Sequence, residues 1–117
     1  MNIRVKRIFE KPDPGDGIRI LVDRLWPRGL SKEKAKIDLW LKSVAPSNDL
    51  RKWYRHDPEK WPEFKERYFA ELNENSKTVD ELIRYIKKGA VTFLYSSKEQ
   101  HYNNAVALKE FIKEVSE

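Results

Sequence analysis

The sequence contains no cysteine, and this absence excludes several kinds of site. Without a thiol there can be no disulfide, no thiolate nucleophile and no zinc–sulfur centre. Glycine is also scarce, with 4 in 117 residues, and no glycine-rich phosphate loop followed by Lys and Ser or Thr is present. The sequence therefore disfavours nucleoside-triphosphate hydrolysis and dinucleotide binding.

Long apolar runs are missing as well. No stretch of about 18 apolar residues exists, so we expect no segment that spans a membrane. The segment Met1–Arg7 alternates charged and apolar side chains and lacks the apolar core of a signal peptide. These features predict a cytoplasmic protein. A length of 117 residues predicts one domain, residues 1–117, and its 39% of hydrophobic residues can form a core without a covalent staple.

Positive charge is plentiful but unevenly placed. The net charge is +5, and residues 1–36 contain ten Lys and Arg against five Asp and Glu. Residues 37–117 contain fourteen of each, so the first third of the chain carries the whole excess. Such an excess attracts phosphates, nucleic acid or acidic small molecules. The alternative is a solvated surface that only keeps the protein soluble.

Three segments predict strands. Residues 3–9 have a β-branched bias, residues 18–25 contain the continuous apolar run Ile20–Val22, and residues 91–95 form a third apolar run. A long helical crossover separates the second strand from the third, so we expect these two to be parallel neighbours in one sheet. The loop at residues 11–17 is too short for a helix and leaves the direction of the first strand open.

About five helices are expected around these strands. Ser31 and Ser47 are suitable N-caps, and Thr78 with Glu81 forms a capping box. The expected helices cover about residues 31–43, a short stretch after Ser47, a longer stretch opened by Asp57 and Pro58, residues 78–89, and a last stretch from about His101 or Asn103 to Val115. In the third of these, Pro62 allows a later start at Trp61. The predicted fold class is α/β: a single domain with a small, mainly parallel sheet packed by about five helices.

Four segments resemble a known family: Leu21–Gly29, Ala45–Ser47, Leu50–Pro58 and His101–Ala105. They are similar to the YeaO-like branch of domain-of-unknown-function family 488, and the similarity covers nearly the whole chain. The resemblance implies a small prokaryotic α/β protein inside the cell with no established activity. Other branches of the family carry cysteines after the strand that corresponds to residues 91–95. This chain has serine and lysine there (96–98), so any chemistry of those cysteines is not available to it.

Polar side chains gather after the second and third predicted strands. In open α/β sheets, ligands bind beyond the carboxyl ends of parallel strands. We therefore expect the residues after these two strands to share one edge. The last helix begins nearby and adds backbone N–H donors with the positive end of its dipole. The candidates at this edge are Asp23, Arg24, Trp26, Arg28, Ser96, Ser97, Lys98, His101, Asn103 and Asn104.

Binding roles follow from the chemistry of these side chains. A guanidinium fork fits carboxylate or phosphate, which favours Arg24 and Arg28 as anion ligands. Surface ion pairing is the alternative for both arginines, and a place in the core or in a wall is the alternative for Trp26. The predicted ligand-binding residues are Arg24, Trp26, Arg28, Ser96, Lys98 and Asn104.

Three side chains are candidate catalytic groups: Asp23, His56 and His101. A carboxylate at a strand end or an imidazole can move a proton near neutral pH. The structural alternative for Asp23 is an ion pair or a turn cap. The structural alternative for His56 is a place directly before Asp57, which caps the next helix. No H-x-x-x-H spacing occurs, so no metal is expected, and no cofactor is indicated. Whether the protein is an enzyme stays open.

Two functions remain from different classes. The first is a site for a small anionic ligand, phosphorylated or carboxylated, at the C-terminal edge of the sheet, with or without catalysis. The second is a nucleic-acid-binding or regulatory module that uses the basic first third and the basic–aromatic segment Arg51–His56. A protein that only mediates interactions is a third option. We favour the first because the polar residues converge on one strand edge. The oligomeric state is not indicated.

Overall fold

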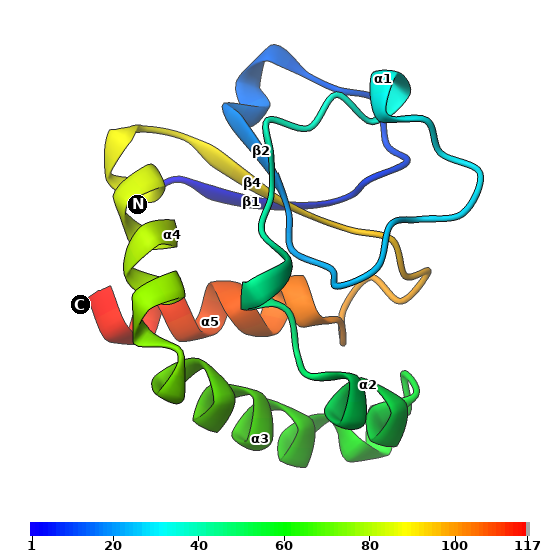
Figure 1. Ribbon diagram of the computed structural model, residues 1–117, viewed down its shortest axis with the longest axis vertical. Helices are drawn as coiled ribbons and strands as arrows, with labels where there is room; N and C mark the ends of the chain where they lie inside the picture. Colours follow the sequence, from blue (N-terminus) through cyan, green and yellow to red (C-terminus); the bar gives the residue numbers. More distant parts are fainter. Residues whose placement is uncertain (117) are drawn as a thin grey trace.

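The computed structural model describes residues 1–116 and contains one four-stranded parallel sheet with helices around it (Figure 1). The strands are β1 (Ile3–Arg7), β2 (Ile18–Leu21), β3 (Leu39–Trp40) and β4 (Val91–Tyr95). Their order across the sheet is β1-β4-β2-β3, and each neighbouring pair is parallel. The predicted α/β class and the parallel pairing of the second predicted strand with the third are confirmed.

The first strand is parallel to its neighbour, which settles the direction that the sequence left open. β1 and β2 are not adjacent, because β4 lies between them: Ile3 and Ile18 both align with Val91. The connection from β1 to β2 contains only a short 3-10 turn, η1 (Pro14–Asp16). It returns the chain to the edge of the sheet where the parallel strands begin. All five residues of β4 are buried, as expected for a central strand that is covered on both faces.

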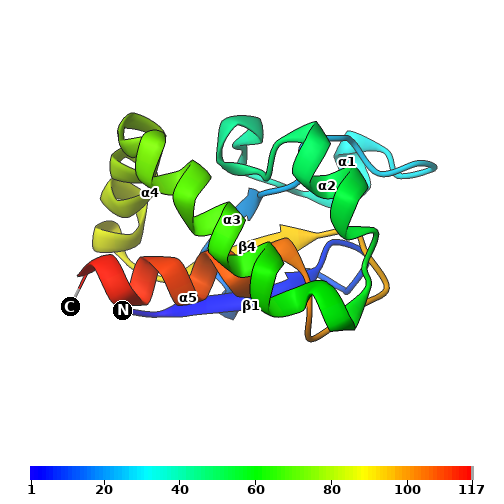
Figure 2. The same ribbon diagram turned by 90° about the horizontal axis from the view of Figure 1, so that it is seen from below.

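The two faces of the sheet are covered differently. α2 (Asn48–Tyr54), α3 (Trp61–Glu74), α4 (Ser76–Lys88) and α5 (Asn104–Ser116) form the larger core with one face (Figures 1 and 2). The opposite face contributes Leu21 and Leu94 to a smaller core, which is covered by α1 (Lys32–Ala35), by Trp26 from the chain after β2 and by Trp40 of β3. Two cores therefore meet at the central strands β2 and β4.

The helix predicted from Ser31 to Ser43 is wrong beyond Ala35. α1 ends at Lys36 in a left-handed conformation (φ 48°), and β3 follows as an edge strand paired with β2. A 3-10 turn, η2 (Lys42–Val44), completes the segment. Its apolar residues have helical spacing, but Trp40 packs into the smaller core whereas Leu41 and Val44 pack into the larger one. The segment crosses the sheet edge, and a single helix could not serve both cores.

Several predicted boundaries also move. α4 begins at Ser76, so Thr78 lies inside the helix and does not cap it. The predicted helix after Asp57 is a 3-10 turn, η3 (Pro58–Lys60), followed by α3, which starts at Trp61. β2 ends at Leu21, four residues before the predicted end, because the chain leaves the sheet after Val22. No helix within residues 1–116 is long and apolar enough to cross a membrane.

Candidate functional site

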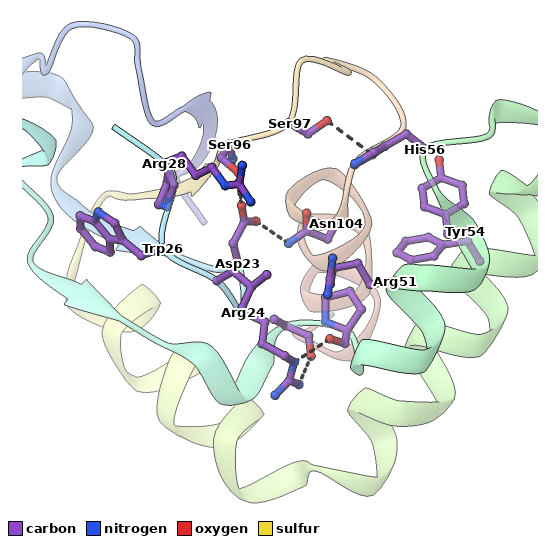
Figure 3. A pocket seen from close by; sticks show the side chains of 15 residues that line it. Asp23, Arg24, Trp26, Arg28, Arg51, Tyr54, His56, Ser96, Ser97 and Asn104 are labelled. Atoms are coloured by element: carbon purple, nitrogen blue, oxygen red, sulfur yellow. Dashed lines mark hydrogen bonds between the residues drawn. The ribbon is translucent and has the colours of Figure 1, made fainter. Parts of the chain in front are cut away.

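A cavity of about 310 Å³ opens where β2 and β4 end, which is the predicted edge of the sheet (Figure 3). It collects side chains from the segment after β2, from α2 and α3, and from the start of α5. The residues that line it are Asp23, Arg24, Leu25, Trp26, Pro27, Arg28, Ala45, Pro46, Arg51, Tyr54, His56, Phe64, Ser96, Ser97 and Asn104. The structure thus brings together seven of the nine predicted site residues and leaves out Lys98 and His101.

Asp23 links the three elements that meet at the cavity. Its Oδ2 accepts hydrogen bonds from the backbone N–H (3.0 Å) and the hydroxyl (2.8 Å) of Ser96. Its Oδ1 accepts from Asn104 Nδ2 at 3.1 Å, and its backbone carbonyl accepts from Trp40 Nε1 at 2.8 Å. The carboxylate therefore joins the ends of β2 and β4 to the start of α5, and it holds Ser96 and Asn104 in place.

The arginines of the cavity differ in how they are held. Arg24 donates from Nε to the carbonyl of Pro46 (3.1 Å) and from Nη2 to that of Ala45 (3.2 Å), so its guanidinium braces the chain before α2. Arg28 is exposed and has no hydrogen bond or ion pair among residues 1–116. Arg51 is exposed too, and its contact within that range is a long one of 3.5 Å to Asn48 Oδ1. Two guanidiniums are thus free to meet a ligand.

The charge of the lining is positive. Three guanidiniums, those of Arg24, Arg28 and Arg51, face one carboxylate, that of Asp23, which leaves +2 when His56 is neutral. α5 has 13 residues and begins at Asn104 on the cavity wall, so the positive end of its dipole lies at the same place. The electrostatics of the cavity favour an anion.

His56 stands at the mouth of the cavity in an unusual backbone conformation. Ser47 caps α2, and the helix ends at Arg55, whose left-handed φ of 49° is followed by a φ of 57° at His56. Left-handed residues other than glycine are uncommon, and two in succession turn the chain sharply. The turn directs the imidazole toward Ser97, with 3.5 Å between Nδ1 and Oγ (Figure 3). A contact of this length is weak and lets the ring respond to a ligand.

Tyr54 forms part of an aromatic wall and not an acid–base group. Burial, together with the negative charges of Glu99 and Asp57, raises the pKa of Tyr54 to about 12. Its hydroxyl donates to the carbonyl of Tyr102 at 2.6 Å, and its ring stacks on Phe64 with 4.2 Å between centroids. The hydroxyl therefore stays protonated near neutral pH, and the ring gives the cavity an apolar side.

Lys98 and His101 do not line the cavity, although the sequence placed them at this edge. Both are exposed on the loop between β4 and α5. His101 contacts its own loop, since its backbone N–H donates to Glu99 Oε2 at 2.9 Å. Asn103 caps α5 by accepting from Val106 N at 3.0 Å, so the helix starts later than a cap at His101 would require. Both predicted site residues are therefore outside the cavity lining.

Arg51 and Tyr54 were not predicted at this site, and neither were the apolar residues Pro46 and Phe64. Arg51 and Tyr54 belong to the basic–aromatic segment that suggested a nucleic-acid contact. In the structure Tyr54 is buried, and the ring of Trp53 is covered by Arg67 (4.3 Å) and Lys60 (5.1 Å). No local pattern marks Pro46 or Phe64, because they reach the cavity only through the packing of α2 and α3.

Comparison with known proteins identifies the family. The family model described as "Inactive DUF488-N3 subclade" matches residues 2–117. The chain belongs to this family. One similar protein is the uncharacterized YeaO of Escherichia coli, which is 39% identical over 97% of this chain and 98% of its own length. An uncharacterized protein of Mycobacterium tuberculosis is 39% identical over 94% of this chain and 92% of its own length. No solved structure gave a match.

Membership of the DUF488-N3 subclade confirms the resemblance seen in the sequence. The relatives named here are uncharacterized, so they assign no ligand or reaction to the cavity. The description of the subclade as inactive agrees with the serines that this chain carries after β4, where the resemblance implies cysteines in other branches.

Proposed function

We propose that the protein binds a small anionic ligand, phosphorylated or carboxylated, in the cavity at the carboxyl edge of the sheet. One observation carries the proposal: Arg28 and Arg51 come from separate segments, line one cavity, and have no ion pair among residues 1–116. A guanidinium presents a planar fork of donors that fits carboxylate or phosphate oxygens. Two such groups facing one cavity are suited to hold an anion from both sides.

The neighbouring groups support the same assignment. The charge of Arg24 is fixed beside the cavity by two carbonyls, so it attracts an anion without needing to move. His56 lies at the mouth, where its ring can donate a hydrogen bond to a bound anion. Asp23 opposes an anion, but its oxygens already accept three hydrogen bonds and are turned toward Ser96 and Asn104.

Binding without turnover fits the chain better than catalysis. Asp23, the strongest catalytic candidate, is engaged in holding three elements together. Within residues 1–116 the His56 ring contacts Ser97 Oγ at 3.5 Å, and no carboxylate bonds to the ring to orient it as a base. The family description as inactive agrees with this assignment. We therefore assign to His56 and Asp23 the roles of orienting the ligand and shaping its site.

The stacking argument for the nucleic-acid alternative loses support. Stacking of bases needs exposed aromatic faces. Tyr54 is buried against Phe64, and the cations Lys60 and Arg67 already cover the ring of Trp53. The charged residues of α2 could still contact phosphates without sequence preference. Such binding would weaken steeply with salt and would not depend on Arg28 in particular.

The proposal is tested by thermal shift with inorganic phosphate and with panels of phosphate monoesters and carboxylates. A ligand at about ten times its Kd adds about 1.4 kcal/mol of stability, which raises Tm by roughly 5 °C in a domain of this size. We expect Arg28→Ala and Arg51→Ala each to weaken binding about tenfold or more, since each removes charged hydrogen bonds. Arg84→Ala is the matched control, because Arg84 is exposed on α4, away from the cavity.

Two results would contradict the proposal. The first is that no phosphorylated or carboxylated compound stabilises the protein at millimolar concentration. The second is that Arg84→Ala weakens binding as much as Arg28→Ala, because the effect would then follow net charge and not the cavity. Binding of DNA or RNA with a steep salt dependence, unchanged in Arg28→Ala, would favour the nucleic-acid alternative.

A further inference from the structure

Beside its charged and polar side chains, the cavity has apolar walls. One wall is formed by Tyr54 and Phe64, which are 4% and 2% exposed and stack on one another. Trp26 lies on the other side of Asp23 (Figure 3), and Leu25, 57% exposed, stands next to it on the lining. A ligand that carried only charge would leave the exposed side chain of Leu25 facing water.

The polar atoms beside these walls already have partners. Tyr54 donates its hydroxyl to the carbonyl of Tyr102, and Trp26 donates Nε1 to the carbonyl of Leu30 at 2.7 Å. Within residues 1–116, no buried side-chain nitrogen or oxygen lacks a hydrogen bond. The walls therefore offer ring faces and aliphatic carbons. A polar ligand body would lose its hydration there without gaining hydrogen bonds, whereas an apolar body would gain by leaving water.

The size of the cavity limits the ligand further. A volume of about 310 Å³ is at the lower end of the range for small-molecule sites. At about 30 Å³ of liquid for each water, it corresponds to about ten waters, and hence to a ligand of about ten non-hydrogen atoms. A nucleoside monophosphate has more than twice as many atoms, so its sugar and base would extend out of the cavity into solvent.

We propose that the ligand is a compact amphipathic anion, with one phosphate or carboxylate group on an aryl or branched-alkyl body of about ten non-hydrogen atoms in total. This inference rests on the proposed function, because Arg28 and Arg51 hold the anionic group. It adds that the side chains of Tyr54, Phe64 and Leu25 contact the body. The site therefore discriminates against nucleotides and against sugar phosphates, whose bodies are large or polar.

The experiment compares three probes by isothermal titration: inorganic phosphate, phenyl phosphate and adenosine monophosphate. We expect phenyl phosphate to bind about tenfold tighter than inorganic phosphate, because the ring is taken out of water. The heat-capacity change should be more negative for phenyl phosphate than for inorganic phosphate. Adenosine monophosphate should bind no tighter than inorganic phosphate.

Two variants separate the apolar contact from the charge. Leu25→Ala should fold normally, since the side chain is largely exposed. It should weaken phenyl phosphate about threefold and leave inorganic phosphate unchanged. Val115→Ala is the control, because Val115 is also exposed and apolar (47%) but lies on α5 outside the cavity. Arg28→Ala should weaken both probes.

The outcomes distinguish this inference from the proposed function. Equal affinity for phenyl phosphate and inorganic phosphate, or tighter binding of adenosine monophosphate than of phenyl phosphate, overturns the inference and leaves anion binding intact. An unchanged phenyl phosphate affinity in Leu25→Ala overturns the placement of the body against Leu25. Failure of every phosphorylated and carboxylated compound to bind overturns the proposed function and the inference together.

Discussion

Asp16 pairs with three of the positively charged side chains in the first third of the chain. It is 1% exposed and accepts hydrogen bonds from Lys6 Nζ at 3.0 Å and from Arg19 Nη1 at 2.6 Å. Arg4 Nη1 lies 3.4 Å from its other oxygen. The excess charge that attracted attention in the sequence is therefore partly structural, because three cations gather around one buried carboxylate on the sheet. The charge available to a ligand comes from residues such as Arg28.

The Asp16 cluster predicts a specific pH dependence of stability. Burial alone would raise the pKa of Asp16, but hydrogen bonds from Lys6, the backbone of Asp13 and Arg19 lower it below its ordinary value of 3.8. The ionised carboxylate thus stabilises the fold fully above that value, and this contribution is lost as the pH falls through the folded-state pKa. We expect Asp16→Asn to cost about 3 kcal/mol at pH 7, because it leaves the buried guanidinium of Arg19 and the partly buried ammonium of Lys6 unpaired.

Urea denaturation of Asp16→Asn and the unsubstituted protein at pH 7 and pH 3 measures this effect. The difference in unfolding free energy should be smaller at pH 3, where the unfolded carboxyl is already largely protonated. Asp80→Asn on α4 is the control and should have little effect at either pH, because Asp80 is exposed. A difference that stays constant between the two pH values would show that Asp16 acts through packing and not through its charge.

At the scale of elements, the predicted cap at Ser47 forms, whereas the capping box expected at Thr78 does not. Ser47 caps α2 by accepting from Leu50 N at 3.2 Å, and its hydroxyl donates to Glu71 Oε2 at 2.6 Å. Its backbone N–H donates to Glu71 Oε1 at 2.8 Å, so the cap also joins α2 to α3. Thr78 was expected to start α4, but the helix already begins at Ser76, one residue after Asn75.

Two alanine substitutions test this assignment of the caps. Ser47→Ala should lower the unfolding free energy by about 1–2 kcal/mol, because it leaves an N–H of α2 without its partner and removes a bond to Glu71. Thr78→Ala should change it by less than about 0.5 kcal/mol, since alanine is a better helix former than threonine inside a helix. Chemical denaturation of both variants gives the values. A loss of about 1 kcal/mol in Thr78→Ala would mean that Thr78 caps α4 after all.

For the molecule as a whole, Arg7 connects the outer strand of the sheet to the cavity. Its Nε donates to the carbonyl of Ser96 at 3.1 Å and to that of Ser97 at 3.0 Å, about 90 residues along the chain. Arg7 does not line the cavity and is a positioning residue. It holds the loop that places Ser96 against Asp23 and Ser97 beside His56.

We expect Arg7→Ala to loosen this loop without unfolding the protein. Hydrogen exchange at the amides of residues 96–99 should become faster, because the loop loses two long-range hydrogen bonds. The amides of β4 should keep their protection, since the strand is central and paired on both sides. Arg84→Ala serves as the control. Unchanged exchange at residues 96–99 would show that the contact of Asp23 with Ser96 suffices to hold the loop.

The sequence by itself determined the α/β class, three of the four strands and the edge of the sheet at which the cavity opens. These features depend on local order: a continuous apolar run such as Ile20–Val22 predicts a buried strand, and polar residues directly after it mark its carboxyl end. Asp23, Arg28 and Ser96 could be placed at the site for that reason alone.

Only the tertiary structure decided which side chains complete the cavity and which charges are free. β3 forms because its residues pack into two cores on opposite faces of the sheet, which no local period shows. Arg51 and His56 reach the cavity through the end of α2 and the left-handed turn after it, whereas Lys98 and His101 lie on the loop before α5, outside the lining. Such outcomes depend on contacts between residues distant along the chain, and local sequence patterns do not encode them.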